Sequence, residues 1–262
     1  MKNASVIALL GFALLFNTAQ SQTIKPINGY YPISKFTKST TQTTHTNMLV
    51  AGQEQEMDMN MKLNTDVSVL SPETTKQVID ININSISGDI KMGTVSQPIP
   101  NISDSGSSFQ LHVNKDGLIS EMYGNTDLVK QMQQSGMNGY AINKPYSQFL
   151  QVKSEMKVGD SWTDSSFADN LMTSHYKFLS CENKIALLAV ISDIKFIADI
   201  DQGGTTIHQN LVGTMTGTVR VNTENNLTIE TLIDMKLEGA MEVNGMSIPL
   251  TLKGSVQEKV NN

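Results

Sequence analysis

Apolar and polar residues alternate over a long stretch at the end of the chain, on both sides of the pair Asn244-Gly245. The apolar residues occupy odd positions before this pair and even positions after it: Leu227, Ile229, Ile233, Met235, Leu237, Met241 and Val243, then Met246, Ile248, Leu250, Leu252, Val256 and Val260. A period of two is typical of a β-strand with one buried face. Asn-Gly favours a two-residue turn, because both central residues need positive φ. The pattern therefore predicts a long antiparallel hairpin.

The two arms of this hairpin also predict their own register. A two-residue turn aligns Val243 with Met246 and Leu237 with Leu252, so that apolar side chains meet along one face. A shift by one residue would carry the charged residues of the other face into the core. These arms are much longer than the usual strand of about five or six residues. Bulges or bends are therefore expected at Gly239 and Gly254.

Residues 56–64, EMDMNMKLN, repeat the alternation with methionine at every second position. Met57, Met59, Met61 and Leu63 share one side. A row of thioethers can ligate soft ions such as Cu(I), but Leu63 continues the row and cannot ligate. The four histidines are dispersed along the chain, without a spacing typical of metal ligands. We interpret the row as the buried face of a strand or an adaptable apolar pocket wall, and expect no metal and no cofactor.

The first residues predict where the protein goes. Lys2 precedes an apolar run over 6–16, and small residues follow at Ala19 and Ser21. This is the pattern of a signal peptide, with cleavage expected between Ser21 and Gln22. The run of 11 residues is shorter than the ~20 that a membrane helix needs, and no cysteine near the cut could carry a lipid. We predict an exported protein, periplasmic or extracellular, that is not a lipoprotein and has no transmembrane segment in its mature chain.

Charge and cysteine content exclude several classes of protein. The net charge is −6, or −7 once Lys2 is removed, and Arg220 is the one arginine. An acidic chain without an arginine cluster is a poor partner for nucleic acid or an anionic membrane. Cys181 is the one cysteine, so the chain has no internal disulfide and depends on packing for stability. We interpret Cys181 as a half-buried structural residue, not a nucleophile.

Two pairs of short motifs suggest an internal duplication. LSPE at 70–73 recurs as LSCE at 179–182, and HVNKDGLISE at 112–121 recurs as RVNTENNLTIE at 220–230. The offset is 109 residues between the two LS motifs and 108 between the two VN motifs. Matching order and spacing favour two similar halves, and the asparagine-rich second motifs favour turns. We predict four segments: a signal peptide over 1–21, a first β repeat over 22–124, a helical connector over 125–154 and a second β repeat over 155–262.

Within the connector, short helices are expected over 125–134, behind a cap at Asn125 or Thr126, and over 145–152, behind Pro145. The Pro- and Ser-rich stretch 95–108 predicts a loop. The threonine-rich stretch 34–47 predicts an exposed strand, because threonine is favoured in strands.

Catalytic motifs are weak throughout. SDSGSS at 103–108 resembles a serine nucleophile segment, but only His45 precedes it as a base. DIDQGG at 199–204 lacks the further ligands of a calcium loop and predicts a hairpin turn. Trp162 is the one tryptophan, and it is either a core anchor or a platform for a ligand. We therefore expect the protein not to be an enzyme.

Three segments together resemble a known family: MKVGDSW, HYKFLSCENKIALLAVISDI and GTMTGTVRVNTENNLTIE. They are similar to the uncharacterised secreted proteins of Bacteroidota gathered as domain of unknown function 6263, most closely from Met156 to Glu230. The resemblance implies an exported β-rich protein and carries no catalytic or binding residues.

The sequence thus predicts an all-β protein of two similar antiparallel halves. They form either one long curved sheet or partial barrel, which we favour, or two packed sandwiches. Long amphipathic strands and many methionines favour binding of an apolar, lipid-like ligand in the cell envelope, with Met57, Met59, Met61 and Trp162 as candidate contacts. The alternatives are a structural or partner-binding envelope protein that acts through exposed β edges, and, less favoured, a hydrolase.

Overall fold

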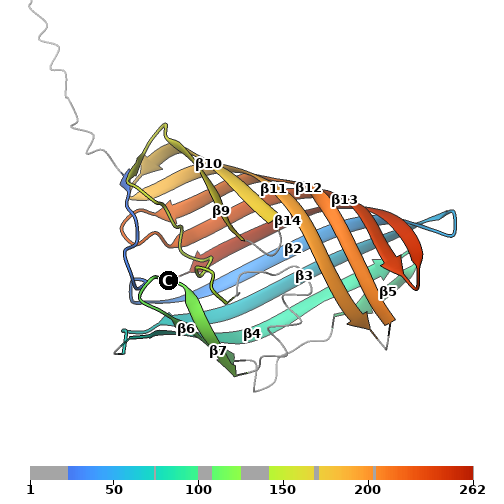
Figure 1. Ribbon diagram of the computed structural model, residues 1–262, viewed down its shortest axis with the longest axis horizontal. Helices are drawn as coiled ribbons and strands as arrows, with labels where there is room; N and C mark the ends of the chain where they lie inside the picture. The colour runs from blue at the N-terminus through green and yellow to red at the C-terminus, as the bar shows by residue number, and fades with distance from the viewer. Residues whose placement is uncertain are drawn as a thin grey trace, which may run out of the picture.

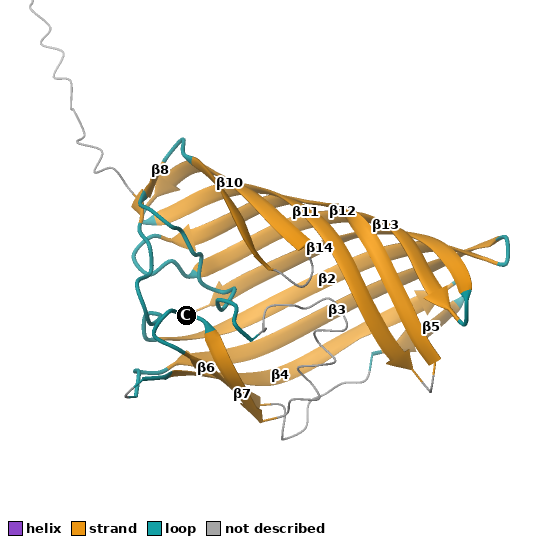
Figure 2. Cartoon of the chain, in the orientation of Figure 1, coloured by secondary structure: helices purple, strands orange, loops and turns teal. Residues whose placement is uncertain are grey.

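The computed structural model describes residues 23–73, 75–99, 108–124, 142–167, 171–202 and 205–261. The described residues form strands, turns and loops and contain no helix (Figure 2). In the first part of the chain the strands are β1 (Thr23–Ile24), β2 (Ser34–Val50), β3 (Gln53–Val69), β4 (Gln77–Met92), β5 (Val95–Pro98), β6 (Ser108–Val113) and β7 (Ile119–Gly124). The second part holds β8 (Met156–Lys157), β9 (Ser161–Phe167), β10 (Leu171–Glu182), β11 (Ile185–Gln202), β12 (Thr205–Asn222), β13 (Thr228–Val243) and β14 (Met246–Asn261).

One curved antiparallel sheet of 12 strands contains both predicted halves (Figure 1). Its order is β7-β6-β4-β3-β2-β14-β13-β12-β11-β10-β9, with β5 added beside β4. The halves join where β2 pairs with β14, from Leu250 opposite Met48 to Asn261 opposite Thr37. The sheet is open, with β7 and β9 at its two edges. The predicted all-β class and long curved sheet are confirmed.

The hairpin register predicted at the chain end is confirmed residue by residue. Val243 lies opposite Met246 and Leu237 opposite Leu252. Asn244 and Gly245 both have positive φ, at 50° and 78°, as the two-residue turn requires. Gly239 and Gly254 interrupt neither ladder, so the expectation of bulges there is wrong. At both glycines a Cβ would collide with a carbonyl oxygen of the neighbouring strand, at 2.0 Å for Gly239 and 2.6 Å for Gly254, so their role is close approach of two backbones.

The inner, concave face of the sheet carries the core. One end of this face is covered by residues of two irregular segments, around Tyr31 and around Tyr146–Val152 (Figure 1). Tyr31 and Phe149 stack with ring centroids 4.8 Å apart and pack on buried strand residues such as Ile79 and Leu111. Threonine-rich β2 is confirmed as a strand, but the expectation that it is exposed is wrong for Thr40, Thr44 and Thr46, which are buried on the inner face.

The helix predicted over 145–152 is wrong. This segment is irregular, with a turn in which Phe149 N–H donates to Tyr146 O at 3.2 Å. Its backbone pairs with two other turns: Leu118 bridges to Pro145, and Leu227 bridges to Phe149. Burial of Tyr146 and Phe149 against the sheet outweighs the local preference for a helix that Pro145 suggests.

The helix predicted over 125–134 lies outside the described residues, as do the serine motif up to residue 107 and the cleavage site at Ser21 and Gln22. The loop expected over 95–108 begins instead with β5, which pairs with β4.

Candidate functional site

A third apolar cluster on the inner face is built only of strand residues in the described part of the chain. Its buried centre is Leu211 on β12, Leu237 on β13 and Leu250 on β14. Five partly buried residues surround this centre: Met48, Ile194, Phe196, Met241 and Leu252. The covering segments that seal the other end of the face contribute no residue to this cluster. We call it the strand-only cluster, and it is our candidate site.

The methionine row predicted from the sequence lies on the inner face beyond β2, and Met61 belongs to the covered cluster that contains Tyr31. Met57, Met59 and Met61 alternate with exposed polar residues along β3, and their burial increases along the strand toward Met61, which is 8% exposed. Across the strand pair, Met57 lies opposite Thr46 and Met59 opposite Thr44. On the other side Met57 lies opposite Met92 and Met59 opposite Ile90. The predicted half-buried strand is therefore confirmed, while a ligand-binding role for these methionines stays a prediction.

Trp162 lies far from the methionine row within the sheet. It stands on edge strand β9, separated from β3 by six strands, and stacks on Tyr176 with ring centroids 5.1 Å apart. Trp162 packs against the cluster that contains Phe178 and Leu188, which fits a core anchor. A hollow of about 330 Å³ lies beside it and also contacts His175 and Ile191. The structure does not bring the four predicted contact residues together in one cluster.

Sequence reasoning missed an ion pair on the inner face. Lys38 Nζ on β2 lies 3.3 Å from Glu258 Oε1 on β14, and the side chains are 10% and 26% exposed. The signal in the sequence was weak but present, because Glu258 interrupts the apolar row of Val256 and Val260. Only the pairing of β2 with β14 reveals that its partner is Lys38.

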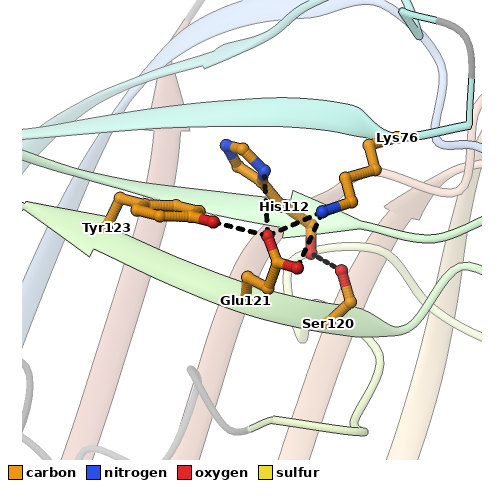
Figure 3. Close-up of polar contacts among 5 residues, drawn as sticks. All are labelled: Lys76, His112, Ser120, Glu121 and Tyr123. Carbon is orange, nitrogen blue, oxygen red and sulfur yellow. Dashed lines mark hydrogen bonds and ion pairs between the residues drawn. The ribbon is translucent and has the colours of Figure 1, made fainter.

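A polar network lies near the free edge of the sheet, around Glu121 on β7 (Figure 3). Lys76 Nζ donates to both carboxylate oxygens of Glu121 at 2.7 Å, and the Tyr123 hydroxyl donates to Oε2 at 2.7 Å. His112 Nδ1 lies 3.6 Å from the same Oε2, and the His112 ring lies 4.6 Å from that of Tyr123. The Ser120 hydroxyl donates to the backbone carbonyl of His112 at 3.0 Å.

The electrostatics of this network hold its groups in their ordinary charge states. The hydrogen bond from Lys76, and then that from Tyr123, lowers the pKa of Glu121. The bond to Glu121 in turn raises the pKa of the Tyr123 hydroxyl. A general acid or base works best with a pKa near the working pH, so these shifts move both groups away from proton transfer at neutral pH. We interpret the network as a structural contact that holds β7 against β6 and against Lys76, the residue before β4.

Other candidate chemistry in the described residues is sparse. Their histidine, cysteine and acidic side chains form no group of three or more that could hold a metal ion. Burial raises the pKa of the Cys181 thiol, which makes it a weaker nucleophile near neutral pH. A polar hollow of about 530 Å³ is lined by outward residues including Lys35, Asp66, Asp80 and Tyr123. Within the described part of the chain we find no helix with the length and hydropathy needed to span a membrane.

We compared the fold of this chain with those of solved structures. The chain is similar to a structure concerned with lipid–protein interactions in lipovitellin, with a TM-score of 0.54 and 6% sequence identity. The match covers 87% of this chain and 25% of that chain, so the protein spans about a quarter of the length of lipovitellin. DynF from the dynemicin biosynthesis pathway of Micromonospora chersina matches over 93% of this chain and 86% of its own, at 6% identity and a TM-score of 0.25, which is too low to support an argument.

Sequence comparison adds the family. No curated protein matches the chain in sequence. Residues 137–228 match the family model described as "Family of unknown function (DUF6263)". This match covers the LSCE motif and most of the second motif, RVNTENNLTIE, on which the resemblance was based. The predicted resemblance to this family is therefore confirmed over residues 137–228, while the secreted, Bacteroidota character of its members stays a prediction.

Proposed function

We propose that this is an exported, non-enzymatic protein of the cell envelope that holds an apolar, lipid-like ligand against the inner face of its sheet. The observation that carries the proposal is the strand-only cluster. Leu211, Leu237 and Leu250 form its buried centre, while Phe196, Met241 and their neighbours stay partly exposed. An acyl chain lying on this surface would complete a layer that the described chain leaves partly open.

The energetics favour such a guest. Removing apolar surface from water contributes roughly 25 cal/mol per Å². Methionine adapts its shape to irregular partners, and methionines line this face on β2, β3, β12 and β13, with Met48, Met59, Met215 and Met241 as examples. The surface therefore suits flexible acyl chains better than a rigid ligand of one shape.

Similarity of fold supports the same proposal. The lipovitellin structure concerns lipid–protein interactions, and its fold resembles that of this chain over 87% of the residues. Proteins of one fold can differ in function, so the similarity supports only the class of ligand. The position that we propose for the ligand rests on the strand-only cluster. Export is proposed from the leader pattern at residues 1–21.

The decisive experiment is native mass spectrometry of the protein purified from its own envelope without detergent, with organic extraction of the same sample. We expect an adduct that extracts as lipid. Met59→Glu should remove this adduct, because it places a carboxylate on the inner face. Asn60→Glu is the matched control, since Asn60 is exposed and points outward from the same strand. A wild-type protein of clean polypeptide mass would contradict the proposal.

A partner-binding function remains the second candidate, because the sheet is open. Among the described strands, β7 and β9 each have a neighbour on one side only, so an extended segment of another protein could add to either edge. Crosslinking in the native envelope, followed by identification of residues 119–124 or 161–167 in the products, tests this alternative. Crosslinks that avoid both edges would contradict it.

We also infer that the two halves arose by duplication. Asn114 Oδ1 accepts from the N–H of Asp116, and Asn222 Oδ1 accepts from the N–H of Glu224, each at 2.9 Å. Both turns then bind the same connector, because Ile119 N–H donates to Lys144 O and Thr228 N–H donates to Gln148 O, each at 2.9 Å. Ile119 and Thr228 are 109 residues apart, the offset of the LS motifs. Related sequences that keep the offset would support this inference, and related single-half proteins without it would contradict it.

A further inference from the structure

A polar hollow of about 530 Å³ lies on the outer face of the sheet, opposite the surface to which we assign a lipid. Five strands line this outer hollow, from β2 through β3, β4 and β6 to β7. One register row crosses all five strands and places these residues next to one another: Lys35, Ser68, Asp80, Gln110 and Tyr123. The volume of the hollow lies within the range of roughly 300–1,000 Å³ that is usual for small-molecule sites.

The depth of the outer hollow follows from the lengths of its side chains. Asp66, Ser68 and Asp80 are short and half-buried, and they alternate with core residues of the inner face. Lys35 and Tyr123 are longer and exposed, and they lie at the two ends of the register row. The hollow is therefore a trough with a polar floor, a cation at one end and an aromatic ring at the other.

The chain itself uses little of the hydrogen-bonding capacity of the outer hollow. Gln110 Nε2 donates to Asp80 Oδ1 at 2.8 Å, which leaves the other carboxylate oxygen of Asp80 as an acceptor. Within the described ranges, the side chains of Lys35, Asp66 and Ser68 take part in no hydrogen bond or ion pair. Two carboxylates oppose an anionic ligand, and Lys35 opposes a cationic one. An uncharged ligand with several hydroxyl groups fits this mixture, because each hydroxyl both donates and accepts.

The aromatic end of the outer hollow is held in place by the network around Glu121 (Figure 3). Tyr123 is 49% exposed, yet its hydroxyl donates to Glu121 Oε2 at 2.7 Å and its ring lies 4.6 Å from that of His112. A side chain that is already held in one orientation loses little freedom when a ligand binds. A fixed, exposed tyrosine ring offers an apolar surface with a polar tip, and the C–H face of a sugar ring packs on such a surface.

We propose that the outer hollow is a saccharide-binding site. Asp66 and Asp80 accept hydrogen bonds from sugar hydroxyls, Lys35 donates to a sugar oxygen, and the ring of Tyr123 packs against the sugar ring. This site lies on the opposite face from the strand-only cluster, so it does not depend on the proposed lipid-binding function.

The test is isothermal titration calorimetry of the purified protein with four trisaccharides: cellotriose, maltotriose, mannotriose and triacetylchitotriose. These probes differ in the stereochemistry and substitution of their hydroxyl groups, and we expect at least one of them to bind. Spermidine is titrated in parallel as a cationic probe of the same carboxylates, and we expect it to bind more weakly than the best trisaccharide.

Two variants then locate the bound trisaccharide. Asp66→Ala should weaken its binding at least about tenfold, because a charge-assisted hydrogen bond is lost. Asp234→Ala is the matched control, since Asp234 is an exposed outward carboxylate of β13, outside the hollow, and it should leave the affinity unchanged. Tyr123→Ala should also weaken binding at least about tenfold, whereas Tyr123→Phe keeps the ring and should retain most of the affinity. If Asp66→Ala does not fold, as judged by far-ultraviolet circular dichroism, Tyr123→Ala carries the test.

Three results would overturn the proposal. The first is that none of the four trisaccharides binds at millimolar concentration. The second is an unchanged affinity in the folded Asp66 and Tyr123 variants, which would place the saccharide elsewhere on the protein. The third is tighter binding of spermidine than of every trisaccharide, which would assign the outer hollow to a cation. None of these results bears on the lipid of the inner face, which native mass spectrometry tests separately.

Discussion

The hydroxyl oxygen of Tyr31 accepts a hydrogen bond from the backbone N–H of Tyr146 at 2.7 Å, across 115 residues of chain. The same hydroxyl donates to the carbonyl of Gly117 at 2.7 Å. One phenol thus joins the segment before β2, the turn before β7 and the connector between the halves. This junction closes the covered end of the inner face.

Loss of that hydroxyl should loosen the covered end. We expect Tyr31→Phe to lower the free energy of unfolding by about 2 kcal/mol, because the N–H of Tyr146 and the carbonyl of Gly117 lose a buried partner. Urea unfolding followed by circular dichroism measures this change. Tyr123→Phe is the control, since Tyr123 is 49% exposed, and its effect should be much smaller. A loss in Tyr31→Phe as small as that expected for Tyr123→Phe would show that the junction does not stabilise the fold.

The same phenol predicts a loss of stability at alkaline pH. Burial raises the pKa of Tyr31 from 10.0 to about 12, opposed by the hydrogen bond from Tyr146. Between these two values the unfolded chain loses the Tyr31 proton while the folded chain keeps it, so the folded state binds more protons. The contribution of Tyr31 is therefore complete below pH 10 and is lost as pH rises toward 12, by about 3 kcal/mol in all.

Unfolding free energies measured across this alkaline range test the sign and the size. The slope of stability against pH should be shallower in Tyr31→Phe than in the wild type. Identical slopes in the two proteins would assign the alkaline transition to other groups.

Close approach of β12 and β13 should make Gly217 intolerant of a side chain. A Cβ at Gly217 would lie 1.9 Å from the carbonyl oxygen of Leu232. We expect Gly217→Ala to cost about 2–3 kcal/mol of unfolding free energy, because the two strands must separate. Thr216→Ala is the control, because Thr216 is the exposed neighbour on the same strand. A neutral Gly217→Ala in thermal or urea unfolding would show that the sheet adapts its curvature freely.

An exposed pair on the outer face should be visible by titration. His45 Nδ1 lies 2.6 Å from Asp58 Oδ1, and this hydrogen bond raises the pKa of His45 above 6.5. The stabilisation is therefore present below the unfolded pKa of histidine and is lost as pH rises through the higher folded value. Nuclear magnetic resonance of the imidazole protons should show the raised pKa, and Asp58→Asn should lower it. Asp66→Asn, which changes another carboxylate of β3, should leave the pKa unchanged.

The alternation of side chains made much of the fold predictable. Asn244-Gly245 set the turn, and the odd and even rows around it set the pairing of Leu237 with Leu252. The same reasoning assigned the methionines of β3 to the half-buried face. The path of residues 145–152 could not be predicted in this way, because it depends on bridges to Leu118 and Leu227, which are distant in sequence. The ion pair could not be predicted either, because Lys38 and Glu258 are 220 residues apart.

The sequence by itself determined the strand character of the alternating segments, the buried face of β3 and of the final hairpin, and the register of that hairpin, because these follow from a period of two and from local turn chemistry. Only the tertiary structure decided that β2 pairs with β14, and this pairing unites both halves in one open sheet. It also decided which apolar residues are covered by Tyr31 and Phe149 and which are left to a strand-only cluster. Both depend on contacts between distant segments, whose energies no local pattern records.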